Sequence, residues 1–336
     1  MSKVTSLEVA RRAGVSQSAV SRVFTPGASA SAKTVEKVKR AAEELGYRPN
    51  VLARAMVSGK SRIIGLVVAY LENQFYPVAL ELLSNALQER GYHILIFTAP
   101  NSTDGVDRVI GDLMDYQVDG IIAASVSMSS PLAERARDAG VPVVLFNRGQ
   151  EGHAFSSVTS TNFKGAQTVT RHLIATGHTK IAHIAGWQGS QTGQERARGY
   201  EAALAAAGQH PFALIDGMYN RKVAAECARQ LLKGQQPDAI FVGNDHMGFA
   251  VLDEVRAHGM IPGQDISVIG FDDVPQAAWG AYDLATYRQP VNRMVEATVT
   301  LMLEQIEAGV APAQNIEIEG KLILRGSVRQ SEGVAP

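Results

Sequence analysis

The sequence has very little cysteine: Cys227 is its single thiol among 336 residues. An internal disulfide is therefore excluded, and a reducing compartment suits the chain. We interpret Cys227 as a packed residue on a helix. No apolar run reaches the roughly 18 residues that a membrane-spanning helix requires, and no charged-then-apolar secretion signal opens the chain. We expect a soluble, cytoplasmic protein.

Motifs that mark common enzymes on α/β folds are also missing. A nicotinamide enzyme needs G-x-G-x-x-G after its first strand, and the sequence there reads VVAYLENQF. G-x-x-x-x-G-K-[ST], H-E-x-x-H and G-x-S-x-G do not occur either. His172, His178 and His183 lie near one another in sequence but lack metal-ligand spacing. We therefore expect no catalytic residue, no metal and no cofactor, and an enzyme on a doubly wound sheet is the disfavoured alternative.

The charges are distributed unevenly along the chain. Residues 1–60 contain eleven Lys and Arg against four Asp and Glu, whereas residues 61–336 contain 21 against 29. A basic head on an acidic body points to a polyanion bound at one end. Contacts to DNA phosphates need such a cluster, although a basic run can also be a solvated helix surface.

The segment from Val4 to Phe24 has the pattern of two short helices around a turn. Apolar residues recur at helical spacing before Gly14, namely Leu7, Val9, Ala10 and Ala13. Gly14 breaks that helix, and Ser16 can cap the next one. Three valines can pack the second helix on the first: Val15, Val20 and Val23. This pattern predicts a helix-turn-helix, whose second helix can enter the DNA major groove.

A third helix is predicted from Ala32 to Leu45, between Ser31 as its cap and Gly46 at its end. Pro49 separates it from a short segment that is too weakly apolar to form a domain. We interpret residues 49–60 as a hinge.

From residue 62 onward, short β-branched runs alternate with helical stretches. The predicted strands are 63–69, 92–97, 119–124, 141–146, 180–185, 239–243 and 266–271. The predicted helices lie near 77–90, 104–116, 131–139, 165–176, 193–207, 222–234, 247–258 and 290–308. Such alternation implies parallel sheets that are covered on both faces. Two similar halves are favoured over one large sheet, because the stretch 147–165 is irregular and polar.

Ligands of doubly wound sheets bind beyond the carboxyl ends of the strands, so the residues there are candidate contacts. They are the stretches 71–76, 125–127, 147–148, 244–245 and 272–273, with Trp187, Arg196 and Trp279. This mixture of amides, charges and rings suits a sugar, whose hydroxyls hydrogen-bond and whose apolar faces stack. The Asp and Asn residues can alternatively cap the helices that follow the strands.

Several of these segments together resemble the lactose-repressor (LacI/GalR) family of bacterial transcription regulators. The matching motifs run from EVARRAGVSQSAVSRVF (8–24) through KTVEKVKRAAEELGYRPN (33–50), ARAM (53–56), GHTKIAHIAG (177–186), RARGYEAAL (196–204), ND (244–245) and ISVIGFDD (266–273) to TYRQP (286–290). Their order and spacing cover nearly the whole chain.

The resemblance implies an α/β fold with an N-terminal, all-α helix-turn-helix domain at 1–48 and a hinge at 49–60. The effector-binding and dimerisation domain is expected at 61–336, with a type I periplasmic-binding-protein-like core of two doubly wound, parallel-sheet subdomains. The N-subdomain would comprise about 61–160 and 289–320, and the C-subdomain about 161–288 and 321–336.

The resemblance also implies DNA-contacting residues. Gln17 and Ser18 match positions that read base edges, and Gln can pair bidentately with adenine. Arg22 is implied as a base or phosphate contact, and Ser16 and Ser21 match phosphate-contacting positions. Ala19 stands where the family often has threonine, so the operator sequence is not predicted.

In the hinge, Met56 matches the position of a leucine that wedges into the central base step of the operator. Met is among the apolar side chains used as minor-groove wedges, so the role can survive the exchange. Ala53 and Arg54 are expected to flank this wedge, with Arg54 near backbone phosphates.

The effector-contacting positions of the family map onto Phe75, Asn147, Arg196, Asn244, Asp272 and Gln289. Arg196 is expected to be the central clamp, and Asp272 to take paired hydroxyls. Thr161-Asn162 stands where the family often has Asp-Asn, and Asn147 is neutral where Asp is common. Fewer carboxylates favour a ligand with some negative charge, so a sugar acid or a phosphorylated sugar is added to the neutral sugars as an expected effector.

The resulting prediction is a sequence-specific, DNA-binding transcriptional repressor whose affinity for its operator is controlled by a small sugar or sugar derivative in the cleft between the subdomains. Its expected partners are a pseudo-palindromic double-stranded DNA operator, the effector, and a second copy of the chain in a homodimer or a tetramer, without a membrane. A sugar-binding transport protein is disfavoured by the DNA-reading module. Whether the effector induces or corepresses, which effector it is, and which genes respond are not predicted.

Overall fold

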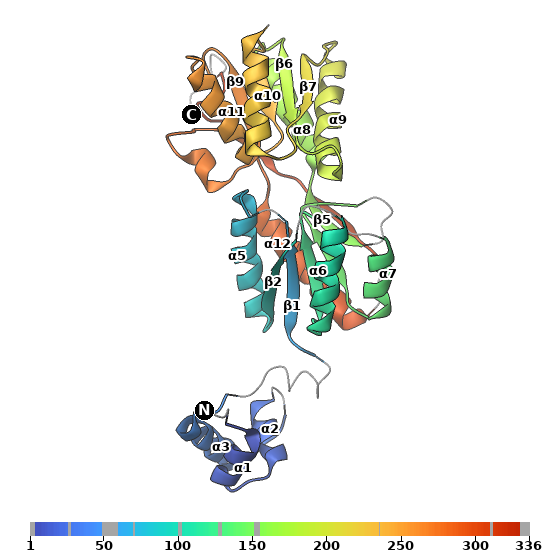
Figure 1. Cartoon of the computed structure of the whole chain (residues 1–336), viewed down its shortest axis with the longest axis vertical. Helices are drawn as coiled ribbons and strands as arrows, with labels where there is room; N and C mark the ends of the chain where they lie inside the picture. Colours follow the sequence, from blue (N-terminus) through green and yellow to red (C-terminus); the bar gives the residue numbers. More distant parts are fainter. Residues whose placement is uncertain are drawn as a thin grey trace. The chain divides into compact units, whose positions relative to one another are not determined.

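The computed structural model describes residues 4–25, 28–48, 60–69, 71–99, 103–126, 130–150, 155–234, 236–309 and 312–329. The chain forms two compact units, Met1–Arg62 and Ile63–Pro336 (Figure 1). None of the helices within the described ranges is long and apolar enough to cross a membrane. The predicted hinge residues Ala53, Arg54 and Met56 lie outside the described residues.

The first unit contains three helices, α1 (Ser6–Ala13), α2 (Gln17–Phe24) and α3 (Ala32–Leu45). Each begins at a side-chain cap: the hydroxyls of Thr5, Ser16 and Ser31 accept backbone N–H groups of the first turns. Gly14 ends α1 with φ +66°, a left-handed conformation that glycine adopts without strain.

The inner faces of these helices form a small core around Val9, Val20 and Val38. Val15 and Val23 pack on it from the side, as their spacing predicts. Leu7 differs from the prediction, because its side chain is 45% exposed. The helical spacing put Leu7 on the same stripe as Val9 and Ala10, but residues two positions apart in a helix are about 200° apart around its axis, so Leu7 lies on the side of α1 away from the buried Val9.

The second unit is built on two six-stranded sheets. The first has the order β11-β5-β4-β3-β1-β2, and all its neighbouring strands are parallel. Its strands are β1 (Ile63–Val68), β2 (His93–Thr98), β3 (Gly120–Ala124), β4 (Val143–Phe146), β5 (Ser156–Ser160) and β11 (Asn315–Ile318).

The second sheet has the order β12-β10-β9-β8-β6-β7 and is parallel except for the antiparallel pair of β12 with β10. Its strands are β6 (Ile181–Ala185), β7 (Ala213–Asp216), β8 (Ala239–Val242), β9 (Ser267–Asp272), β10 (Ala285–Arg288) and β12 (Lys321–Ile323). Central strands such as β6, β8 and β9 are buried throughout, which agrees with their largely apolar sequences.

Helices cover both sheets. The first sheet carries α5 (Phe75–Glu89), α6 (Thr103–Asp115), α7 (Ser130–Asp138) and α12 (Val291–Ala308) (Figure 1). The second carries α8 (Asn162–Ala175), α9 (Gln191–Ala206), α10 (Arg221–Lys233) and α11 (Asp245–Ala257), with the short 3-10 helix η1 (Pro275–Ala278). The chain crosses between the sheets where β5 leads to α8, β10 to α12, and β11 to β12. The carboxyl ends of both sets of parallel strands consequently face one cleft.

The polar stretch 147–165 was predicted to be irregular, and here the structure differs. Ser156–Ser160 forms strand β5, and all five residues are buried. Its hydroxyls are satisfied by partners distant in sequence: Gln305 Nε2 donates to Ser156 Oγ, and Ser157 Oγ donates to Asn315 Oδ1. A strand of serines and threonines has no hydrophobic alternation, so a pattern-based prediction misses it.

Candidate functional site

The outer face of α2 is polar and exposed. Ser16, Gln17, Ser18, Ser21 and Arg22 all lie on it, while Val20 on the opposite face is buried. Gln17 Nε2 donates to Ser6 Oγ at 2.9 Å, and Ser16 Oγ lies 3.0 Å from Ser18 Oγ. The second helix of a helix-turn-helix is the one that can enter a DNA groove, so this exposed polar face of α2 is a candidate DNA-contacting surface.

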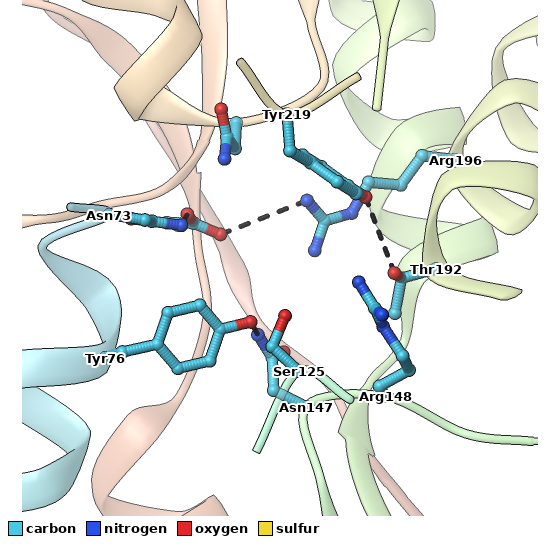
Figure 2. Close-up of a pocket in the computed structure, with 10 residues that line it drawn as sticks. Asn73, Tyr76, Ser125, Asn147, Arg148, Thr192, Arg196 and Tyr219 are labelled. Atoms are coloured by element: carbon cyan, nitrogen blue, oxygen red, sulfur yellow. Dashed lines mark hydrogen bonds and ion pairs between the residues drawn. The ribbon is translucent and has the colours of Figure 1, made fainter. Parts of the chain in front are cut away.

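A polar cavity lies between the two sheets of the second unit (Figure 2). It encloses about 390 Å³ of space between the protein atoms, a figure that includes the solvent at its opening. Its wall consists of Asn73, Tyr76, Ser125, Asn147, Arg148, Thr192, Arg196, Tyr219, Asn244 and Asp272. The first five follow strands of the first sheet, and the other five belong to the second sheet and its helices.

Backbone strain is concentrated in this wall. Ser125, Asn147, Tyr219 and Asp272 have φ values of +60°, +59°, +53° and +134°, in the region that side chains rarely adopt. Strained residues persist only where the surrounding structure holds them, and they cluster at functional sites. The cavity wall therefore has the backbone signature of a binding site.

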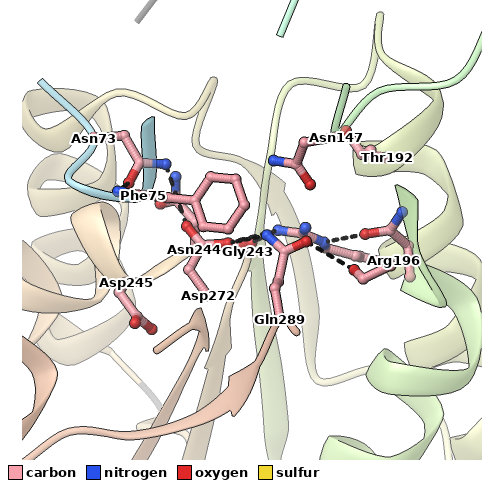
Figure 3. A network of polar contacts seen from close by, with 12 residues as sticks. Asn73, Phe75, Asn147, Thr192, Arg196, Gly243, Asn244, Asp245, Asp272 and Gln289 are labelled. Atoms are coloured by element: carbon pink, nitrogen blue, oxygen red, sulfur yellow. Dashed lines mark hydrogen bonds and ion pairs between the residues drawn. The ribbon is translucent and has the colours of Figure 1, made fainter. Parts of the chain in front are cut away.

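Arg196 on α9 is held by several partners (Figure 3). Its Nε donates to Asn162 Oδ1 at 3.0 Å, and Nη1 donates to the carbonyl of Gly243 at 2.6 Å. Nη1 lies 3.9 Å from Asp272 Oδ1, and the guanidinium stands over the ring of Phe271 at 3.6 Å. These contacts fix one planar donor group at the cavity before any ligand enters.

Asp272 at the end of β9 is the hub of a buried network. It accepts hydrogen bonds from Gln289 Nε2 at 2.6 Å and from Asn73 Nδ2 at 3.2 Å. Asn73 precedes α5, so this second bond joins the two sides of the cleft. Gln289 in turn accepts from Ser160 Oγ at 2.8 Å, which ties two of the segments that cross between the sheets.

A second buried carboxylate, Asp245, lies behind the wall. It accepts from Thr286 Oγ1 at 2.6 Å and from the backbone N–H of Val274 at 3.0 Å. Burial raises the pKa of Asp245 well above its ordinary value, and the neighbouring charge of Asp272 raises it further. Burial also raises the pKa of Asp272, against the opposing effect of Arg196.

The wall from the first sheet is less completely bonded. Asn147 Nδ2 donates to the Tyr76 hydroxyl at 3.2 Å, but Asn147 Oδ1 is buried with no hydrogen-bond partner among the described residues. Arg148 is only 3% exposed, and its Nη1 is likewise buried without a partner there. Its guanidinium lies 5.7 Å from the ring centre of Trp187, which follows β6 of the other sheet.

Four of the residues that sequence reasoning assigned to an effector line the cavity: Asn147, Arg196, Asn244 and Asp272. Asn244 also caps α11, because its Oδ1 accepts from Met247 N at 3.0 Å. Capping and ligand contact were treated as alternatives, but this residue is placed for both.

Phe75 and Gln289 are placed differently from what was predicted, since neither belongs to the cavity wall. The ring of Phe75 stacks on Phe146 with centroids 6.2 Å apart, and the neighbouring Tyr76 is the aromatic residue of this helix that lines the cavity. Gln289 lies behind the cavity wall and donates a hydrogen bond to Asp272, which lines the cavity.

The family resemblance mapped no effector position onto Asn73, Tyr76, Ser125 or Arg148, but all four were among the candidate contacts that follow predicted strands. Thr192 and Tyr219 were not predicted as contacts. Tyr219 follows β7, a short strand that the sequence pattern did not predict, so nothing marked it. Thr192 lies in the first turn of α9, two residues beyond its cap Ser190.

No group of three or more His, Cys, Asp or Glu side chains that could hold a metal is found in the described ranges. His183 is buried against Phe241, with ring centroids 4.2 Å apart, and burial lowers its pKa to about 4. A neutral, stacked imidazole of this kind is a packing residue.

Comparison with known proteins places both units in one family. Residues 6–50 match the bacterial regulatory proteins of the lacI family, and residues 170–328 match the periplasmic binding protein-like domain. The HTH-type transcriptional regulator CelR of Thermobifida fusca is 34% identical over 331 residues, which cover 95% of this chain and 96% of that protein. The HTH-type transcriptional repressor PurR of Edwardsiella ictaluri is 30% identical and covers 96% of each chain.

Solved structures agree with these matches. The lac repressor dimer bound to operator and the anti-inducer ONPF superposes with a TM-score of 0.88 at 25% identity, over 98% of this chain and all of that chain. A CelR–cellobiose complex gives a TM-score of 0.72 at 32% identity, over 97% of this chain and all of that chain.

An N-terminal helix-turn-helix joined to a two-sheet, periplasmic-binding-like core defines a DNA-binding transcriptional regulator. The chain belongs to the LacI family of these regulators.

Proposed function

We propose that this regulator is a repressor whose operator affinity is controlled by a small polyhydroxylated effector in the cavity between the sheets. The observation that carries this proposal is the composition of the wall. Amides, hydroxyls, arginines and one carboxylate from both sheets converge on a single small cavity. Groups of this kind recognise the hydroxyls of sugars and their derivatives. The cellobiose complex of the related CelR supports a carbohydrate class of ligand.

The coupling to DNA follows from the two-sided construction of the site. An effector that contacts Arg196 on one side and Asn147 on the other has a different affinity for open and closed clefts. Its binding therefore shifts the angle between the two sheets, and DNA affinity changes by the same coupling free energy. Inducer and corepressor roles both fit this scheme.

On the DNA side, α2 would enter the major groove, with Gln17 and Ser18 at base edges and Ser16, Ser21 and Arg22 at phosphates or bases. A homodimer would read a pseudo-palindromic operator, which is supported by the lac repressor dimer on its operator. A regulator of this kind would work in the cytoplasm, beside the chromosome.

Genomic fragments selected on the full-length protein test both halves of the proposal. We expect the selection to enrich a pseudo-palindromic sequence. In fluorescence anisotropy, one sugar or sugar derivative should then weaken or strengthen the binding of the protein to this operator. A protein that selects no sequence, or an operator complex that responds to no polyol, would contradict it.

A further inference from the structure

The two arginines of the cavity differ in what they are bonded to. Asp272 is the one acidic residue in the wall, and it is already engaged by Gln289, Asn73 and Arg196. No carboxylate among the described residues lies within ion-pair distance of Arg148. The wall thus contains two guanidinium groups against one carboxylate, with the surplus positive charge on Arg148.

Burial makes this surplus costly. Arg148 is 3% exposed, and its Nη1 donor is buried without an acceptor in the described parts of the chain. A buried charged donor without an acceptor loses its hydration and gains no hydrogen bond in return. Stacking at 5.7 Å over Trp187 supplies a weak cation–π contact but accepts no hydrogen bond. An acceptor that arrives with a ligand would complete the site.

The surroundings of Arg148 favour negative charge from a second side. The first turn of the 16-residue helix α9 reaches the cavity at Thr192, and Arg196 lies one turn further along the same helix. Figure 2 shows Arg148, Thr192 and Arg196 directed toward the same part of the cavity. A helix N-terminus carries partial positive charge and binds anionic oxygens.

We propose that the effector is an acid, and that its carboxylate or phosphate group binds between Arg148 and Arg196 beside the first turn of α9. This inference rests on the proposed function and narrows its ligand class. Arg148 follows β4 of the first sheet, whereas Arg196 belongs to the second, so one oxyanion would contact both sides of the cleft. The polyol part would remain for Asn147, Asn244 and Asp272.

Probes that share one sugar skeleton with and without an acidic group test the proposal on the full-length protein. Glucose, gluconate, glucuronate and glucose 6-phosphate, and the corresponding galactose series, are compared at equal ionic strength by thermal shift and calorimetric titration. We expect acids to bind and their neutral parents to bind at least tenfold more weakly. Gluconate and glucuronate report a carboxylate site and the phosphates a phosphate site.

The variant Arg148→Met keeps an unbranched apolar stem and removes the charged guanidinium. Acid affinity is expected to fall about 10- to 100-fold, the usual effect of losing a charge-assisted hydrogen bond. Arg148→Lys should retain part of the affinity, because a point charge remains. Arg221→Met is the matched control, since Arg221 is an exposed arginine paired with Asp253 outside the cavity, and its acid affinity should be unchanged.

A second readout needs no ligand. Removing a buried charge that lacks a partner should raise the melting temperature of Arg148→Met by about 3 °C in buffer without polyols or acids. A lowered melting temperature together with equal affinity for acids and neutral sugars would overturn the acid site and leave the effector cavity intact. Selection of an operator by α2 does not depend on Arg148, so failure of the proposed regulatory function would be seen separately, as the absence of a selected DNA sequence.

Discussion

The two sides of the effector cavity are built from similar residue types but are bonded differently. On the second-sheet side, Arg196 and Asp272 have protein partners for their charges and form one network with Asn162 and Gln289. On the first-sheet side, Arg148 Nη1 and Asn147 Oδ1 are buried without partners among the described residues.

The second-sheet side is therefore preorganised for a ligand, whereas the first-sheet side has polar groups that a ligand could still satisfy. A side whose donors are already fixed gives a ligand its orientation at little entropic cost. A side with unsatisfied groups gains most when the ligand arrives, because hydrogen bonds that were missing are then formed. An effector that bridges both sides is thereby linked to closure of the cleft.

The largest effect on stability is expected on the second-sheet side of the cavity. Arg196→Met should lower the free energy of unfolding by about 3 kcal/mol, because it leaves the acceptors of Asn162 and Gly243 without their donor and removes the positive charge beside Asp272. Urea titration followed by circular dichroism measures this change. Effector binding should be lost in the same protein.

The same exchange at Arg148 is expected to have the opposite sign on stability, so the two variants together test the comparison directly. If Arg148→Met and Arg196→Met destabilised the protein equally, the two sides would not differ as described.

Much of this architecture could be predicted from the sequence, since local signals carry it. The bounds of α3, from the Ser31 cap to the left-handed Gly46, follow from capping chemistry and an apolar stripe. The strands β1, β6 and β9 were predicted because they are buried parallel strands with continuous apolar sequences.

What could not be predicted depends on contacts between distant segments. The polar strand β5 is stable because Gln305, 149 positions away, bonds to Ser156. The choice of Tyr76 over Phe75 as the cavity residue depends on which ring packs on Phe146. The unsatisfied state of Arg148 is a property of the folded surroundings, which no residue type or spacing encodes.

The next largest effect is the pH dependence of stability that Asp245 causes from behind the second-sheet side of the cavity. The raised pKa of Asp245 means that the folded state holds this proton more tightly than the unfolded state, whose carboxyl titrates near 3.8. The resulting stability is fully present below that value and is lost as pH rises toward about 8. Asp272 and Asp273 face Asp245 and add to the repulsion.

Asp245→Asn should flatten this dependence, because the amide stays neutral and can still accept from Val274 N. The difference in unfolding free energy between wild type and variant is expected to shift by about 2 kcal/mol in favour of the variant between pH 6 and pH 8. Denaturant titrations at intervals of one pH unit measure it. Parallel curves for the two proteins would show that Asp245 does not titrate in this range.

A smaller effect, on effector release, is expected from the hydrogen bond that joins the two sides of the cavity without a ligand. Asn73→Ala removes the 3.2 Å bond to Asp272 across the cleft and should weaken effector binding by about 1.5 kcal/mol, through faster dissociation. Stopped-flow fluorescence, with Trp187 beside the cavity as one of the two tryptophans, follows the release. Asn73→Asp is the sharper companion, because it keeps the acceptor for Phe75 N but sets a like charge against Asp272. Unchanged release from both variants would remove this contact from the closure mechanism.

The smallest predicted effect is a change in ligand preference at the first-sheet side, from acids toward neutral sugars. Asn147→Asp places a carboxylate next to Arg148 at a position whose φ of +59° both Asn and Asp tolerate better than most residues. The Tyr76 hydroxyl, which now accepts from Asn147, can donate to the new carboxylate, so the fold should be kept. Acid affinity is then expected to fall about tenfold, or 1.4 kcal/mol, while neutral sugars gain.

The control for this last variant is Asn147→Gly, which permits the same backbone conformation without the charge. If acids weaken in the Asp variant but not in the Gly variant, electrostatics at Arg148 sets the ligand class. If both variants weaken acids and neutral sugars alike, Asn147 acts as a hydrogen-bonding group only. The surplus positive charge of Arg148 would then have to be balanced by a group other than the effector.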